Sequence, residues 1–85
     1  MKNELLPIGS VIAIKEAELM ICGYFKKDAS YNGEKYDYVC CIYPSGMGPE
    51  AIFVKKEIIE RVKFIGYQNG NYVEFKHKYM GDKNE

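Results

Sequence analysis

The sequence predicts a mainly β domain of the α+β class, a small antiparallel barrel of about five short strands with a C-terminal helix. Two observations support this prediction. Short apolar segments rich in β-branched and aromatic residues recur along the chain, and Gly, Pro, Asn or Asp separate them, as is typical of strands joined by turns. The last apolar segment, which follows Asn69-Gly70, instead repeats its aromatic residues at helical spacing.

The chain is long enough for one hydrophobic core. It has 85 residues, of which 47% are hydrophobic and 28% are charged, a composition typical of a folded globular domain. We therefore expect a single domain over 1–85. Its barrel core is expected at about 5–67 and its helical segment at about 71–80.

The first two strands are expected near the N-terminus. A bend at Pro7–Gly9 precedes a predicted strand at 11–15. Residues 16–18 are interpreted as a tight turn, so a second strand at 19–25 should run antiparallel to the first. Gly23 inside this second strand predicts a β-bulge.

The middle of the chain contains the most strongly predicted strand. Polar residues at 26–35 predict a mobile, exposed loop, and the strand YDYVCCIY follows at 36–43. Both faces of that strand are apolar, so we expect it to lie inside the sheet. Two prolines and two glycines at 44–49 end it, and a short strand resumes at 51–54.

The segment 55–60 predicts a single helical turn that places Ile58 or Ile59 on the core. Residues 61–67 then alternate with period two, as expected of a last strand. The predicted core consists of apolar residues from the strands, namely Val11, Ala13, Ile21, Val39, Cys41, Phe53 and Val62.

The C-terminal segment fits two structures. Asn69-Gly70 followed by alternating residues would form a hairpin with another strand. Against this, Tyr72 and Phe75 recur at helical spacing, Asn71 is suited to cap a helix and Gly81 to end one. We expect the helix, and the hairpin stays open as the alternative.

Charge and hydropathy argue against several classes of partner. Twelve basic residues balance twelve acidic ones, so no positive field steers the chain to nucleic acid or to an anionic membrane. The apolar runs are far shorter than a membrane helix, and the N-terminus lacks the pattern of a secretory signal. We expect a cytoplasmic protein with no nucleic-acid or membrane partner.

The cysteines do not suggest a metal site. Cys40 and Cys41 are adjacent in a predicted strand and should point to opposite faces, and Cys22 leaves the total odd. We expect three free, mostly buried thiols. Because no Cys-x-x-Cys pair occurs and the single histidine, His77, is distant in the chain, no metal and no cofactor are expected.

No catalytic set can be assembled from the sequence. A nucleophile needs a base within hydrogen-bond reach and a group that orients this base. Asp37 and Glu50 could be imagined as an acid and base pair, but no spacing brings them together. We therefore expect a protein that is not an enzyme.

Tyrosine is unusually frequent, with eight residues in 85 and no tryptophan. Tyrosine supplies rigid contact area at protein interfaces, but it is also ordinary on a half-buried sheet, so both roles are open. The candidate protein-binding residues are Tyr36, Tyr38, Tyr43, Tyr72 and Phe75.

Several phrases of the sequence together resemble a known family. They include Leu5-Leu6-Pro7-Ile8-Gly9-Ser10-Val11, Tyr36-Asp37-Tyr38-Val39, Tyr43-Pro44 and Gly66-Tyr67. From about Leu5 to Tyr67 the chain is similar to the DUF4176 family, a domain of unknown function in small Gram-positive proteins. The resemblance implies a gene neighbourhood of type VII secretion, near toxins with an LXG targeting domain and their helical partners.

This context implies a non-enzymatic, protein-binding accessory or chaperone-like factor, whose partner is the toxin or its targeting helices. The alternative is a small barrel that binds a peptide or nucleic acid in a regulatory role. The order of short strands, with a single turn before the last one, also resembles a Src-homology-3-like barrel, although a fold alone does not determine function. The identity of the partner and the oligomeric state stay open.

Overall fold

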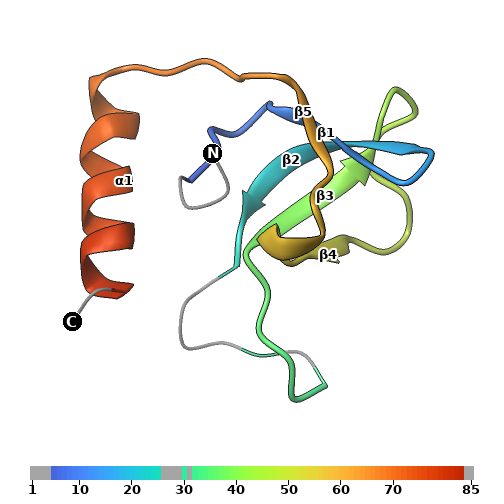
Figure 1. The fold of residues 1–85 in the computed structure, drawn as a ribbon, viewed down its shortest axis with the longest axis horizontal. Helices are drawn as coiled ribbons and strands as arrows, with labels where there is room; N and C mark the ends of the chain where they lie inside the picture. The colour runs from blue at the N-terminus through green and yellow to red at the C-terminus, as the bar shows by residue number, and fades with distance from the viewer. Residues whose placement is uncertain (1–4, 26–29, 31, 84–85) are drawn as a thin grey trace.

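The computed structural model describes residues 5–25, 30 and 32–83. Five strands form one antiparallel sheet in the order β4-β3-β2-β1-β5, and a helix follows (Figure 1). The elements are β1 (Val11–Ile14), β2 (Ala17–Tyr24), β3 (Tyr38–Ile42), β4 (Ile52–Val54), the 3-10 helix η1 (Lys56–Ile58), β5 (Arg61–Phe64) and α1 (Gly70–Lys83). The mainly β class with a C-terminal helix is thus confirmed. The sheet is not closed into the predicted barrel, because β4 and β5 are its two edges.

The hairpin of β1 and β2 turns earlier than its sequence predicts. Ala17 already pairs with Ile14, so the turn consists of Lys15 and Glu16. Lys15 has a φ of 56°, a left-handed conformation that tight turns require.

The strand β3 is an interior strand, as predicted, because it pairs with β2 on one side and with β4 on the other. The register between β2 and β3 shifts between Ile21 and Gly23, which confirms the bulge at Gly23. Half of the predicted loop at 26–35 lies outside the described residues. Asn32 and Gly33 are described and form a turn with φ of 54° and 78°.

The core lies on one face of the sheet, which we call the core face, and the other is the outer face. Its buried cluster consists of Leu5, Leu6, Ile12, Leu19, Ile21, Tyr38, Cys40, Val54 and Ile59. Of the predicted core, Ile21 belongs to this cluster and Val62 packs against it. Val11, Ala13 and Cys41 are buried on the outer face, where Val39 and Phe53 are half-buried.

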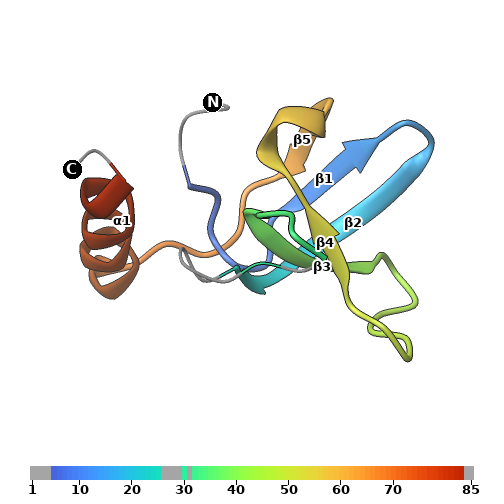
Figure 2. The same ribbon diagram turned by 90° about the horizontal axis from the view of Figure 1, so that it is seen from below.

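Four of the seven predicted core residues, Val11, Ala13, Ile21 and Cys41, are thus buried, although only Ile21 of these four lies in the main cluster. Strands β1 and β3 carry apolar side chains on both faces, so an alternating pattern cannot decide which face becomes the core. The decision comes from the segments that cover the sheet. The N-terminal segment with Leu5 and Leu6 lies between the sheet and α1 in both views (Figures 1 and 2).

The C-terminal segment is a helix, and the hairpin alternative is wrong. The helix cap is Asn69 rather than Asn71, because the Oδ1 of Asn69 accepts a hydrogen bond of 2.9 Å from the Tyr72 amide. The helix also continues to Lys83, past the stop predicted at Gly81.

Aromatic side chains attach α1 to the sheet. The Phe75 ring stacks on Tyr24 with centroids 5.3 Å apart, and Tyr79 lies 6.0 Å from the same ring. Tyr72 donates a hydrogen bond of 2.5 Å from its hydroxyl to the Leu5 carbonyl. Burial in this cluster raises the pKa of Tyr24 well above its ordinary value, and the nearby Tyr72 adds to the shift.

The link from β5 to α1 is held against the N-terminal bend. The buried Ser10 hydroxyl accepts a hydrogen bond of 2.9 Å from the Gly66 amide. A Cβ atom at Gly66 would overlap the Ile8 carbonyl oxygen, so only glycine allows this approach. The last strand therefore ends at Phe64 rather than at Tyr67, and the following residues lead to the helix.

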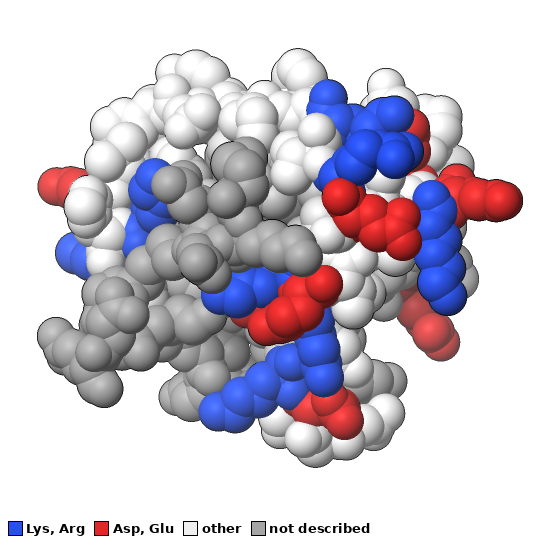
Figure 3. Space-filling view, viewed as in Figure 1, with Lys and Arg blue, Asp and Glu red and all other residues white. Residues whose placement is uncertain are grey.

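Acidic and basic side chains are mixed over the face seen in Figure 3. This mixing agrees with the formal net charge of zero. Within the described residues, no helix is long and apolar enough to cross a bilayer.

Candidate binding groove

The core face is not covered along its whole length. Beyond the buried cluster it opens into a groove of about 530 Å³, which we call the apolar groove. Its aliphatic lining comes from every strand but β5 and from η1: Ile14, Leu19, Ile42, Ile52, Val54 and Ile58. Leu19 and Val54 also belong to the buried cluster, so the groove continues the core to the surface.

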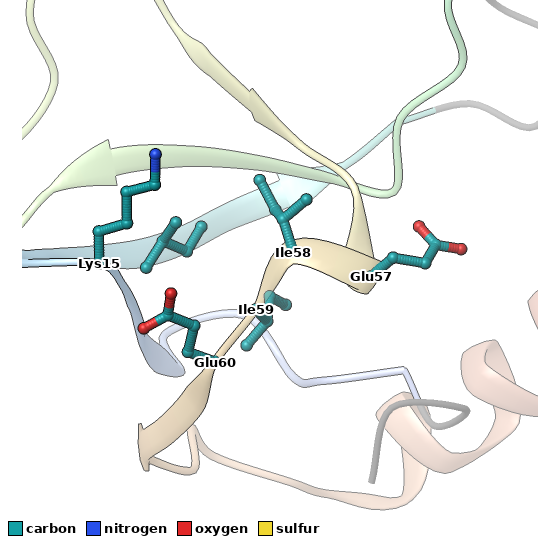
Figure 4. Close-up of a pocket in the computed structure, with 6 residues that line it drawn as sticks. Lys15, Glu57, Ile58, Ile59 and Glu60 are labelled. Carbon is teal, nitrogen blue, oxygen red and sulfur yellow. The ribbon is translucent and has the colours of Figure 1, made fainter.

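A second hollow of about 730 Å³ adjoins the apolar groove, and we call it the acidic hollow. The two share Ile14 and Ile58, while Lys15, Glu57 and Glu60 lie around the second (Figure 4). Ile14 and Ile58 therefore separate two adjacent depressions.

The 3-10 helix η1 sets the position of Ile58. The Asp37 carboxylate, which comes just before β3, accepts a hydrogen bond of 2.8 Å from the Lys56 amide at the start of η1. The consecutive side chains of Ile58 and Ile59 point in opposite directions (Figure 4). Ile59 is buried at 8% exposure, whereas Ile58 is 51% exposed, so the prediction that one of them reaches the core is confirmed for Ile59.

Large apolar side chains remain exposed around the apolar groove. Ile42 and Tyr43 at the end of β3 are about as exposed as Ile58, and all three line it. A single exposed apolar residue is ordinary, but several gathered around one depression are typical of an interaction site.

The rim of the two depressions is mainly acidic. Four glutamates line them against one lysine, Lys15. Glu18 is 3.6 Å from Lys63, an ion pair across β1. In the part of the chain that the structure describes, Glu16, Glu57 and Glu60 belong to no ion pair. The rim would therefore favour a partner with positive charge beside its apolar side chains.

Of the predicted binding residues, Tyr43 lines the apolar groove and Tyr38 does not. Tyr38 is buried at 2% exposure, and its hydroxyl accepts a hydrogen bond of 3.1 Å from the Leu6 amide. Burial raises the pKa of Tyr38 to about 12. Its assignment as a binding residue is therefore corrected, because a ring inside the core cannot contact a partner.

The remaining predicted rings lie elsewhere. The ring centroids of Tyr36 and Phe53 are 5.6 Å apart. The Lys55 ammonium lies 5.7 Å from the centroid of the Tyr36 ring. Lys55 also forms an ion pair of 2.5 Å with Glu34, and its hydrogen bond lowers the pKa of that carboxyl.

Tyr72 and Phe75 hold α1 against the sheet, although Phe75 keeps part of its ring exposed. The structure therefore does not bring the five predicted residues together in one surface.

Sequence reasoning missed the isoleucines of the apolar groove. Ile14 and Ile42 are the last residues of β1 and β3. The apolar alternation of each strand extends to them, although the sheet there is no longer covered by other segments. The pair Ile58-Ile59 did contain a signal, because a single 3-10 turn cannot bury two consecutive side chains on one face.

The polar side chains that line the two depressions are carboxylates, one ammonium group and the Tyr43 hydroxyl. Among the described residues, no three His, Cys, Asp or Glu side chains gather in a way that could hold a metal ion.

Comparison with protein families finds a model described as Domain of unknown function (DUF4176), which matches residues 5–75. No curated protein matches the chain, and no solved structure matches it. The matched residues include every strand, η1 and the first part of α1.

Proposed function

The chain belongs to the DUF4176 family, and on that premise we propose that it is a non-enzymatic, protein-binding accessory factor. In this proposal it acts in the cytoplasm as a chaperone-like partner of a toxin exported by type VII secretion. The observation that supports binding is the apolar groove, where Ile42, Tyr43 and Ile58 are exposed beside the core. Leaving such a surface in water is unfavourable, and a partner segment would cover it.

The groove favours an amphipathic helix of the partner as its occupant. A helix presents an apolar stripe that fits an aliphatic groove, and residues beside the stripe meet the rim. Because Glu16, Glu57 and Glu60 surround the depressions, lysine or arginine beside the stripe would be complementary in charge.

The likeness to Src-homology-3-like barrels also belongs to this proposal. The strand order β4-β3-β2-β1-β5 and the 3-10 helix before the last strand support it. The gap between the edge strands departs from a closed barrel. In this arrangement the groove would occupy the uncovered end of the partly open barrel.

The test is a binding measurement with matched variants. We expect the chain to bind the targeting helices of the toxin encoded beside its gene, measured by isothermal titration calorimetry. The substitution Ile58→Ser should raise the dissociation constant at least about tenfold, because it removes an apolar contact at the centre of the site.

The control is Ile8→Ser, because Ile8 is 53% exposed but does not line the groove. Its dissociation constant should equal that of the unchanged chain. Equal weakening by both substitutions would contradict a specific site. Binding to random duplex DNA with steep salt dependence would instead favour the nucleic-acid alternative.

A further inference from the structure

Two cysteine side chains meet on the outer face of the sheet, away from the apolar groove. Cys22 on β2 and Cys41 on β3 are free thiols whose sulfur atoms are 3.1 Å apart. The strands pair Met20 with Cys41, and the register shift between Ile21 and Gly23 leaves Cys22 outside the one-to-one pairing. The bulge therefore brings Cys22 toward Cys41 across the two strands.

The two thiols differ in their access to solvent. Cys41 is buried, whereas Cys22 is partly exposed. The third cysteine, Cys40, is fully buried in the core cluster on the opposite face of β3. A reagent from solvent can thus reach Cys22 first, and Cys41 is the thiol placed to react next.

We propose that Cys22 and Cys41 form an oxidisable dithiol site that small disulfides such as oxidised glutathione close into a cross-strand disulfide. The Cys22 thiolate attacks one glutathione sulfur, which forms a mixed disulfide and releases one glutathione thiolate. Cys41, after losing its proton to solvent, then attacks the Cys22 sulfur and releases the second glutathione. The protein loses two protons and two electrons, and one glutathione disulfide becomes two thiols.

The sulfur atoms of a disulfide are about 2.05 Å apart, so those of Cys22 and Cys41 would have to approach by about 1 Å. Burial, with the hydrogen bond to Cys41, raises the pKa of Cys22 to about 11. Cys22 is therefore protonated at neutral pH and reacts slowly there, which makes mildly alkaline solution suitable for the test.

The test uses the reduced full chain with oxidised glutathione, followed by acid quenching and intact mass spectrometry. We expect a product that is two hydrogen atoms lighter and carries no glutathione. Peptide mapping without reductant should join Cys22 to Cys41. The substitution Cys22→Ser should slow formation of any intramolecular disulfide at least tenfold, and Cys40→Ser should leave the closure rate unchanged.

The substitution Cys41→Ser provides the sharpest readout, because the mixed disulfide should then accumulate on Cys22. If that variant does not fold, the peptide map of the unchanged chain still decides the question. A bond from Cys22 to Cys40, a stable glutathione adduct on the unchanged chain, or no oxidation would each overturn the proposal.

Discussion

Both ends of the core face carry apolar side chains, but other segments of the chain cover these side chains at only one end. At one end the N-terminal segment and α1 cover the sheet (Figure 2). There the ring of Tyr24 packs against those of Tyr38 and Phe75. At the other end Ile42 and Ile58 remain exposed around the apolar groove. We call these the covered end and the open end.

The difference shows that an apolar strand face does not by itself become core. Burial stabilises an aliphatic side chain by about 1.5–3 kcal/mol, but only where another segment is available to exclude water. The chain supplies such a segment at the covered end through Leu5 and Leu6. At the open end η1 buries Ile59 and leaves Ile58 outside.

The largest expected effect separates two tyrosines, one at each end. Tyr38→Ala should lower the free energy of unfolding by about 3–5 kcal/mol, because it leaves a cavity and removes the acceptor of the Leu6 amide. Tyr43→Ala, at 50% exposure, should change it by less than about 0.5 kcal/mol. Urea denaturation measures both values, and equal losses would contradict the comparison.

An intermediate effect is expected from alkaline pH at the covered end. Burial raises the pKa of Tyr38 from 10.0 to about 12, so its neutral form is favoured in the folded state. This contribution is fully present below pH 10 and is lost as pH rises through 12, at most about 3 kcal/mol. Cys40, raised from 9.0 to about 12 by burial, should add to the loss from pH 9 upward.

The matched variant for this pH dependence is Tyr38→Phe, which cannot ionise. Its free energy of unfolding should fall less steeply between pH 10 and 12 than that of the unchanged chain, as measured by urea titrations at each pH. Parallel pH profiles for the two proteins would show that Tyr38 does not contribute to the loss.

The smallest expected effect is at the open end. Ile58→Ala should change the free energy of unfolding by less than about 0.5 kcal/mol, because its side chain is already half in water. The adjacent Ile59→Ala should lower it by about 2–4 kcal/mol, since it removes a core side chain. Thermal or urea unfolding of both variants makes this comparison, and similar values would mean that the orientation of η1 is wrong.

Local sequence patterns were sufficient for the strands, the bulge and the C-terminal helix. Runs of β-branched and aromatic residues predicted the strands, because such side chains suit a pleated, half-buried surface. Gly23 predicted the bulge and the aromatic spacing from Tyr72 predicted the helix. The predicted boundaries were less accurate. For the helix, Asn71 was predicted as the cap, but Asn69 is the residue that accepts the hydrogen bond from the first turn.

The candidate site could be predicted only in part. Tyr43 was identified from its residue type, and the structure places it in the apolar groove. Tyr38 was identified in the same way and lies in the core. Residue type does not distinguish these two rings, because the difference between them is whether a segment distant in the sequence covers them.

The sequence by itself determined the class of fold, the order of its elements and the absence of a strong net charge, because these depend on composition and on local periodicity. Tertiary structure alone decided which face of the sheet carries the main core cluster, where the core remains open and how Cys22 meets Cys41. The physical reason is that β1 and β3 are apolar on both faces, so the alternating pattern gives the two faces similar energies. Only the packing of the N-terminal segment and α1, which lie far apart in the chain, makes one of them the core.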